Sequence, residues 1–459
     1  MKEKLFILGL DCIDSNILDN LNFTPNIKKM VAQGTYGTLN STIPPITVPA
    51  WSSMLSGKDP GELGVYGFRN RRTYRYDDEV FASSHMVKFD RLWDLFSKVN
   101  KKSIIVGVPQ TYPINPINGF LVSGFDSPKN SNEFCYPKEL STFIKEEIGE
   151  YLFDVTDFRN TPLDEVLDTV YSMTEKRFDL MENLIRENEW DFSILCEIGT
   201  DRIHHCFWKY HDKNHPEYEY HDKYSNVIID YYMYIDNRIG RLLNILDDDS
   251  TTFLIVSDHG AKAMYGGVCI NEILIREGWL VLKEKPNEPT KLTKDLIDWS
   301  KTKAWGDGGY YSRIFLNIVG REPQGKISPK DLRHYKEELT KLLQKIKLDN
   351  GIEISNKVYW PERIYRRVRG LAPDLIVLLG DLHWRSIGKV GYKSNWIIEN
   401  DTGTDGANHS MDGVYIISGP NIKKNVRRDS SIYDITPTII QQFNLPVNDD
   451  YIGENIFND

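Results

Sequence analysis

Residues 251–260, with the sequence TTFLIVSDHG, join an apolar run to Asp258, His259 and a glycine. A short, continuous apolar run predicts a strand that is buried on both faces, as in a parallel sheet. An Asp and a His directly after such a strand would lie side by side at its carboxyl end. Because carboxylate and imidazole ligands together suit Zn²⁺ or Mn²⁺, the segment predicts an α/β fold with metal ligands at a strand end.

Acidic residues and histidines flank other apolar runs in the same way. The further examples are Asp11 after KLFILGL (4–10), Asp201 and His205 after DFSILCEIG (191–199), and His409 a short loop before GVYIISG (413–419). Ligands of open α/β sheets bind outside the carboxyl ends of the strands, so we expect these side chains to converge. Taken singly, each also has a structural interpretation. An Asp after a strand often caps a helix, and a lone His is often a core residue.

Apolar runs alternate with amphipathic stretches along the chain. Further strands are expected near 103–109, 119–125 and 373–380, and helices over 163–188 and 222–247. This alternation predicts a mostly parallel central sheet with helices on both faces. We expect residues 1–270 and 371–459 to form that core.

Two segments interrupt the pattern. Residues 271–370 hold a strand-like RIFLNIV (313–319) and a helix-like KDLRHYKEELTKLLQKI (330–346), which together suggest an inserted cap or lid. Residues 126–185 carry acidic and aromatic residues without a strong strand signal, so they are a candidate for a further insertion.

Composition narrows the class of function. The 459 residues carry a formal net charge of −10, which argues against a large duplex nucleic-acid surface because such surfaces need clustered Lys and Arg. A small anionic substrate is compatible with this charge, since bound divalent cations would offset acidic residues locally. The five cysteines are scattered without a C-x-x-C pair, and no apolar run is long enough to cross a membrane. We therefore expect reduced thiols, a cytoplasmic location and no membrane partner.

The segment STIPPITVPAWSSMLSGKDPGELGVYGF, residues 41–68, contains the candidate nucleophile. Pro49 and Gly57 bracket a helix of about two turns that begins near Thr47. Thr47 could serve only as a helix N-cap, or it could present its hydroxyl among free backbone N–H groups where a phosphate binds readily. A Thr hydroxyl is a weak nucleophile at its ordinary pKa, so metal coordination would be needed to stabilise its alkoxide.

Five motifs in this order resemble the type I phosphodiesterase/nucleotide pyrophosphatase family of the alkaline phosphatase superfamily. They are GLDCID (9–14), PPITVPAW (44–51), TDRIHH (200–205), SDHG (257–260) and DGANHSMDGVYIISGP (405–420). The resemblance implies an alkaline phosphatase-like core with two divalent metal ions, usually Zn²⁺ and in some members Mn²⁺. One metal ion would be held by Asp11, Thr47, Asp258 and His259, and the other by Asp201, His205 and His409. His204 lies off the family spacing.

The resemblance also implies a mechanism. Thr47 would attack phosphorus and expel the first alcohol or nucleotide, and water would then cleave the phospho-threonine intermediate. The chain is therefore expected to be a two-metal-dependent phosphoester hydrolase, and specifically a phosphodiesterase. Its substrate would be a small phosphoester, with nucleotides among the candidates.

One departure concerns the substrate. Nucleotide pyrophosphatases typically carry an Asn soon after the nucleophile, whereas Ala50 and Trp51 stand there in this chain. The resemblance therefore does not extend to nucleotide specificity. Candidates for substrate binding are Trp51, Arg202 and Lys262, which flank the motifs, and the aromatic residues Tyr66, Phe68, Trp305, Tyr310 and Tyr311. Core or surface roles are the ordinary alternative for these residue types.

Other functions fit parts of the pattern. A sulfatase would need Cys or Ser in C/S-x-P-x-R, and neither residues 47–51 nor residues 135–139 contain the Arg. A phosphomonoesterase or a phosphonate hydrolase would use the same metal pair, but Thr as nucleophile favours the diesterase branch. A phosphotransferase is a closer alternative, since an alcohol could replace water in the second step, but relatives of that kind often carry membrane helices. A non-catalytic metal-binding relative would be expected to have lost some of the ligands, and here all are present.

Overall fold

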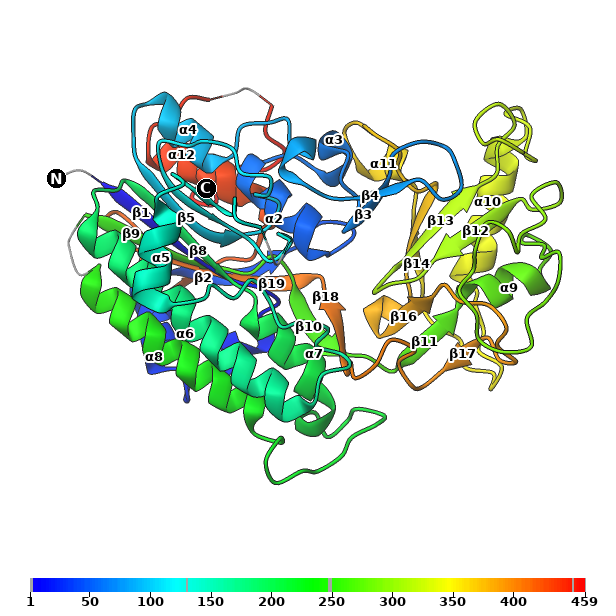
Figure 1. Ribbon diagram of the computed structural model, residues 1–459, viewed down its shortest axis with the longest axis horizontal. Coiled ribbons are helices and arrows are strands. Elements are labelled where there is room, and N and C mark those ends of the chain that lie inside the picture. Colours follow the sequence, from blue (N-terminus) through cyan, green and yellow to red (C-terminus); the bar gives the residue numbers. More distant parts are fainter. Residues whose placement is uncertain (1–2, 129–130, 247–249, 448–449, 459) are drawn as a thin grey trace.

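The computed structural model describes residues 3–128, 131–246, 250–447 and 450–458, which fold into two lobes (Figure 1). The larger lobe surrounds a ten-stranded sheet, and the smaller lobe is built on a four-stranded sheet. Within these residues, none of the helices combines the length and the hydropathy that crossing a bilayer requires.

The central sheet is mostly parallel. Its strands in spatial order are β20 (Val426–Arg427), β2 (Gly34–Asn40), β19 (Asp412–Ser418), β9 (Thr251–Val256), β1 (Lys4–Leu10), β8 (Phe192–Glu197), β5 (Ser103–Val108), β6 (Gly119–Ser123) and β7 (Cys135–Tyr136), with β21 (Ser430–Ser431) beside β2. Neighbours from β9 through β6 run parallel, whereas β19 is antiparallel to both β2 and β9. The predicted fold class is therefore confirmed.

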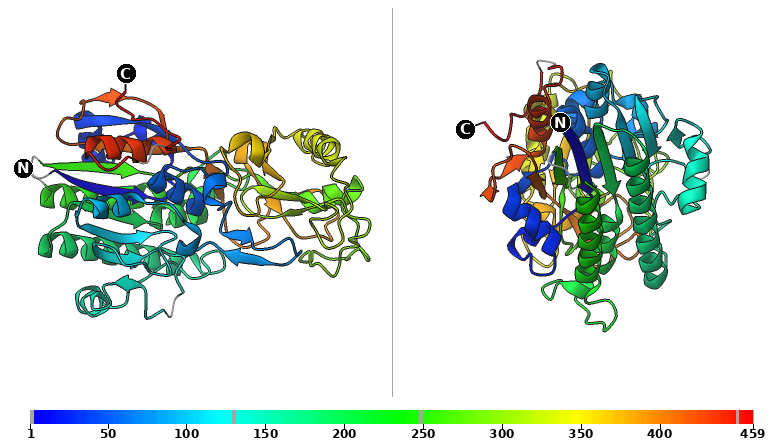
Figure 2. Two further views of the ribbon diagram at one scale, coloured as in Figure 1. Left: turned by 90° about the horizontal axis from the view of Figure 1, so that it is seen from above. Right: turned by 90° about the vertical axis from the view of Figure 1, so that its left-hand side faces the viewer.

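Helices cover both faces of this sheet, as Figure 2 shows. Along β1, Leu5 and Ile7 pack into one apolar core while Phe6 and Leu8 pack into another, because side chains of a strand alternate between faces. The helices of the first core are α2 (Thr47–Ser56), α4 (Leu92–Lys98) and α12 (Ile435–Gln442). Those of the second are α1 (Pro25–Gln33), α5 (Leu140–Ile148), α6 (Leu163–Glu187), α7 (Gly199–His211) and α8 (Val227–Ile245). Each such apolar side chain stabilises the fold by about 1.5–3 kcal/mol when fully buried.

The segment 126–185, a candidate insertion, contributes to this second layer. Phe178 and Leu184 of α6 lie in the same core as Phe6 of the central strand β1. A helix that covers a sheet has an amphipathic pattern and no strand signal, which is why the segment looked separate in the sequence.

The smaller lobe has an antiparallel sheet of β12 (Ala304–Asp307), β13 (Ser312–Leu316), β15 (Leu375–Leu378) and β14 (Lys357–Tyr359). Beside it lie β16 (Trp384–Ile387), β11 (Gly266–Cys269) and β17 (Trp396–Ile397), with α9 (Ile270–Arg276), α10 (Leu332–Gln344) and α11 (Pro361–Ile364). The strand expected within 313–319 and the helix expected within 330–346 are β13 and α10. The run at 373–380, expected in the central sheet, instead forms β15 of the smaller sheet, so this lobe continues past residue 370.

A hairpin from the larger lobe, β3 (Arg69–Arg71) and β4 (Glu79–Phe81), lies against the smaller lobe (Figure 1). Between its strands, the Tyr76 ring stacks on Trp299 with centroids 3.5 Å apart and planes at 6°. Arg71 Nη1 lies 3.2 Å from Glu322 Oε1, and both side chains are buried. The stacked rings and the buried ion pair hold the two lobes in one arrangement.

Glu322→Ala should lower the free energy of unfolding by about 3–5 kcal/mol, because the substitution leaves the buried Arg71 guanidinium without its carboxylate. Urea unfolding followed by tryptophan fluorescence measures the change. As a control, Glu353→Ala breaks an exposed pair with Lys347 and should change stability by at most about 1 kcal/mol. Equal losses in the two variants would contradict a special role for the buried pair.

Candidate active site

The predicted ligands converge beyond the carboxyl ends of three neighbouring strands. Asp11 follows β1, Asp258 and His259 follow β9, and α7, which follows β8, carries Asp201 and His205. His409 lies in β18 (Ala407–Ser410), which pairs with β10 (Gly260–Ala263), so it stands within a strand and not in the loop that we expected before β19. Two groups result, Asp11–Asp258–His259 and Asp201–His205–His409, and in each the ligand atoms lie within 4.8 Å of one another.

The first group is fully buried and rich in negative charge. His259 Nε2 lies 3.2 Å from Asp258 Oδ2 and 3.7 Å from Asp11 Oδ1. Burial, and then repulsion from Asp201 and Asp11 respectively, raises the pKa of Asp11 and of Asp258 well above the ordinary range. Asp11 Oδ1 and Asp258 Oδ2 have no hydrogen-bond partner. Unpaired buried carboxylate oxygens are unfavourable, so this group fits a bound cation.

The second group uses two successive turns of one helix. Asp201 and His205 are four residues apart on α7, and His205 Nε2 lies 3.1 Å from Asp201 Oδ1. His409 Nε2 is 3.8 Å from the same oxygen. Burial works to lower the pKa of His205, but the carboxylates of Asp201 and Asp405 outweigh it and raise that pKa to about 9. The His259 and His409 rings stack with centroids 3.8 Å apart, which brings the two groups together.

The three histidines present the same nitrogen to the ligand groups. In each ring Nδ1–H donates outward: His205 to Asp405 Oδ1 at 2.8 Å, His409 to the Pro45 carbonyl at 2.8 Å, and His259 to the Gly260 carbonyl at 3.2 Å. Such outward hydrogen bonds fix the tautomer that leaves the Nε2 lone pair for a metal ion. With the unpaired carboxylate oxygens, the residues fit two divalent cations.

Thr47 is the first residue of α2, and its hydroxyl faces the first group. Thr47 Oγ1 lies 3.3 Å from His259 Nε2. The N-cap position is occupied by Ile46 with extended backbone, so Thr47 does not serve as the cap. Gly57 ends the helix at φ 66°, a left-handed conformation that glycine adopts without strain. The hydroxyl therefore lies at a helix N-terminus, where free backbone N–H groups favour an anion.

Three further residues support the second group: Asp405 and Arg159 were not predicted as site residues, and Tyr310 was expected only as a substrate-binding candidate. Asp405 accepts from His205 Nδ1 through one oxygen, and its other oxygen accepts from Arg159 Nε and the Tyr310 hydroxyl, both at 2.8 Å. The Tyr310 ring, from the loop between β12 and β13 of the smaller lobe, stacks on His205 with centroids 4.8 Å apart. The only sequence signal was the position of Asp405 four residues before His409.

The substrate-binding candidates next to the motifs have other partners. Trp51 is fully buried and donates Nε1–H to Asp11 Oδ2 at 2.8 Å, so it orients a ligand. The guanidinium of Arg202 bonds both oxygens of Asp154, at 2.8 and 2.7 Å, and also binds Asp201. Lys262 Nζ donates to the Asp381 carbonyl at 2.8 Å. His204 donates to the Cys12 carbonyl at 2.8 Å, away from the cluster.

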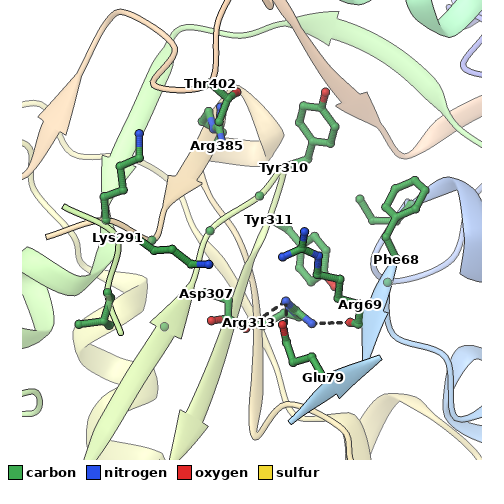
Figure 3. A pocket seen from close by; sticks show the side chains of 18 of the residues that line it. Phe68, Arg69, Glu79, Lys291, Asp307, Tyr310, Tyr311, Arg313, Arg385 and Thr402 are labelled. Carbon is green, nitrogen blue, oxygen red and sulfur yellow. Dashed lines mark hydrogen bonds and ion pairs between the residues drawn. The ribbon is translucent and has the colours of Figure 1, made fainter. Parts of the chain in front are cut away.

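A cleft of about 910 Å³ opens between the lobes, with Thr47, Asp201, His205 and His409 in its wall. Of the aromatic candidates, Phe68, Trp305, Tyr310 and Tyr311 line this cleft, and Arg202 also reaches it. Figure 3 shows Tyr310 and Tyr311 on one strand-connecting segment, with Phe68 opposite them. Tyr66 is directed elsewhere and donates to the Arg369 carbonyl at 2.6 Å. The volume is in the range of sites that enclose a small organic ligand.

Comparisons with known proteins agree with this arrangement. Residues 5–412 match the family model described as type I phosphodiesterase/nucleotide pyrophosphatase. A search of curated proteins finds no match. Among solved structures, the chain is similar to human ectonucleotide pyrophosphatase/phosphodiesterase 5, with 12% identity, a TM-score of 0.57, and coverage of 98% of this chain and 97% of that one. At this identity the likeness shows a shared fold.

Asp405→Asn should weaken binding at one of two metal sites by about 10–100-fold, because the amide no longer fixes the His205 ring in its ligating tautomer. Titration of the metal-free protein with Zn²⁺, followed by calorimetry, would show one weakened site and one unchanged site. Asp381→Asn, an exposed carboxylate held by Lys262 and Lys357, is the control and should leave both sites unchanged. Two unchanged sites in Asp405→Asn would refute the orienting role.

Proposed function

The chain belongs to the type I phosphodiesterase/nucleotide pyrophosphatase family, and on this premise we propose that it is a metal-dependent phosphodiesterase with Thr47 as its nucleophile. The observation that carries the proposal is the Thr47 hydroxyl, held at a helix start 3.3 Å from His259 and in the wall of the cleft. A hydroxyl that serves only structure would be expected to cap the helix, and Ile46 occupies that position.

Two divalent cations, Zn²⁺ or Mn²⁺, would complete the site. Asp11, Thr47, Asp258 and His259 would hold one, and Asp201, His205 and His409 the other. When bound, the ions supply Lewis-acid stabilisation of the Thr47 alkoxide and of the charge that develops on the phosphate oxygens. Mixed carboxylate and imidazole ligands support this choice of ions.

The chain's own residues account for two displacements. In the first, Thr47 Oγ1 loses its proton to water in the cleft and forms a bond to phosphorus. The bond to the first alcohol's oxygen breaks, and the departing alkoxide takes up a proton from that water. The N–H groups at the start of α2 bind the phosphate oxygens as charge develops on them. In the second, water attacks phosphorus, the bond to Thr47 breaks, and a phosphomonoester leaves while the hydroxyl is restored.

Related activities differ in what enters or leaves this site. Phosphomonoester or phosphonate hydrolysis would need only a small substrate, whereas the cleft of about 910 Å³ supports a diester with a sizeable second alcohol. A phosphotransferase would admit an alcohol in place of water. The presence of all seven ligand side chains in two compact groups argues against a non-catalytic relative. The five cysteines are unpaired and buried, which supports the proposed cytoplasmic location.

Thr47→Ala should reduce kcat/KM for a chromogenic diester such as bis(p-nitrophenyl) phosphate by at least about a thousandfold, because the attacking oxygen is lost. Thr47→Ser keeps a hydroxyl and should retain turnover. Acid quench and intact-mass analysis should detect a phosphodiester adduct on the wild type and none on the alanine variant. Ser56→Ala, at the far end of the same helix, controls for effects on the helix. Comparable turnover by Thr47→Ala would exclude Thr47 as nucleophile.

Removing the metal ions should abolish turnover and destabilise the fold. Metal that binds only the folded state adds about 2.7 kcal/mol when its free concentration is 100 times its dissociation constant. Dialysis against a chelator should therefore lower Tm, and Zn²⁺ or Mn²⁺ should restore both Tm and diester cleavage. A wild-type protein that hydrolyses diesters equally well after chelation, with no bound metal by elemental analysis, would refute the metal requirement.

A further inference from the structure

The lining of the cleft is richer in cationic side chains than the protein as a whole. Ten cationic side chains and seven carboxylates line it, although the whole chain carries a net charge of −10. Positive charge therefore gathers in the wall of a cleft that already contains the nucleophile. Such a concentration of cations attracts an anionic ligand.

Five of these ten cations are neutralised locally. Arg159 pairs with Asp405, Arg202 with Asp154 and Asp201, Arg313 with Glu79 and Asp307, Arg71 with Glu322, and Lys294 with Asp77. Arg69 and Arg75 are exposed on the β3–β4 hairpin, and Arg69 lies over the Phe81 ring. The cations on the wall that the smaller lobe contributes are less completely neutralised.

There, three cations lie on the cleft wall and only one carboxylate, that of Asp401, pairs with any of them. Arg385 Nη1 lies 3.4 Å from Asp401 Oδ1, and Lys389 Nζ lies 3.2 Å from Asp401 Oδ2. Lys291 has no carboxylate partner among the described residues, and Figure 3 shows it in the wall of the pocket with Arg385 and Thr402. The group therefore keeps an excess of positive charge.

Backbone pairing brings together the two segments that carry these lysines. Thr290 and Val390 exchange both backbone hydrogen bonds, at 2.7 and 2.9 Å, in an antiparallel bridge. Lys291 follows Thr290 and Lys389 precedes Val390, so both lysines lie next to this bridge, and both line the cleft. Two like charges next to one bridge repel each other, and a bound anion would offset the repulsion.

Arg385 adds a donor that has no partner. Its side chain is about nine-tenths buried, with a relative exposure of 8%, and its Nη1 is held by Asn400 Oδ1 and by Thr402 Oγ1 at 2.9 Å. Its Nε–H is buried and makes no hydrogen bond. A guanidinium fixed at one corner with a free N–H is suited to charge-assisted bonds with a phosphate.

We propose that Lys291, Lys389 and Arg385 form a second phosphate subsite, which binds a phosphoryl group carried by the substrate away from the scissile phosphorus. The substrate class is then a phosphodiester whose retained or departing alcohol bears a further phosphate. This inference rests on the proposed function for the role of the ligand as substrate, whereas the subsite itself is defined by its charge and its donors. No additional chemical step is involved, because the second phosphate is bound and not cleaved.

Matched pairs of small phosphates test the subsite directly. Calorimetry would compare thymidine 3′,5′-bisphosphate with thymidine 5′-monophosphate, and propane-1,3-diol bisphosphate with its monophosphate. The two bisphosphates differ in the distance between their phosphates. The wild type should bind at least one bisphosphate about tenfold or more tighter than its monophosphate, since hydrogen bonds to charged groups are each worth that factor or more. The double variant Lys291→Ala/Lys389→Ala should lose that ratio. Arg385→Lys, which keeps the positive charge but loses the planar set of guanidinium N–H donors, should reduce the affinity ratio.

Lys341→Ala, an exposed lysine of α10 outside the cleft, is the matched control and should keep the wild-type ratio. Hydrolysis of thymidine 5′-(p-nitrophenyl phosphate) is measured on the same preparations. Turnover without any preference for bisphosphates would overturn the second subsite and leave the proposed function standing. A lysine-dependent preference without turnover would support the subsite and overturn the proposed function. A preference that survives in the double variant would also overturn the subsite.

Discussion

Three carboxylates, those of Asp11, Asp201 and Asp258, are buried close together, and the fold has to compensate for their repulsion. Burial of an unpaired charge is unfavourable by several kcal/mol per ion. Asp201 is balanced within the chain, because His205 and Arg202 overcome the effect of burial and hold its pKa well below the ordinary range. For Asp11, burial and the charge of Asp201 outweigh the same two cations and raise its pKa, and for Asp258 burial and the charge of Asp11 raise the pKa. The parallel strands β9, β1 and β8 thus bring together groups whose charge is fully compensated only by cations.

Ligands that follow local rules could be predicted from the sequence. Asp11, Asp258 and His259 come directly after apolar strands, and Asp201 and His205 are one helical turn apart, so chain geometry alone brings each set together. Sheet membership was harder, since an apolar run such as 373–380 does not specify which sheet it joins. Arg159, Tyr310 and Asp405 come from three distant segments and meet only through tertiary packing, which periodicity does not describe.

Nearness to a motif was a poor guide to the direction of a side chain. Lys262 is next to Ala261, which pairs with His409 across β10 and β18, so alternation along the strand turns Lys262 to the other face. Trp51 follows the proposed nucleophile, Thr47, closely, yet it points into the core against Gly9. A Cβ at Gly9 would lie 2.3 Å from the Trp51 ring. The close approach of that glycine makes room for the indole that donates to Asp11.

The contact between Tyr310 and His205 joins the smaller lobe to a proposed metal ligand. Any motion that parts the lobes also removes the ring and hydroxyl that keep Asp405 and His205 in place. Coupling of this kind is reciprocal. If parting the lobes weakens cation binding by some factor, a bound cation shifts the equilibrium toward closed lobes by the same factor. Metal supply would thereby set how often the cleft opens, and so how readily substrate enters and product escapes.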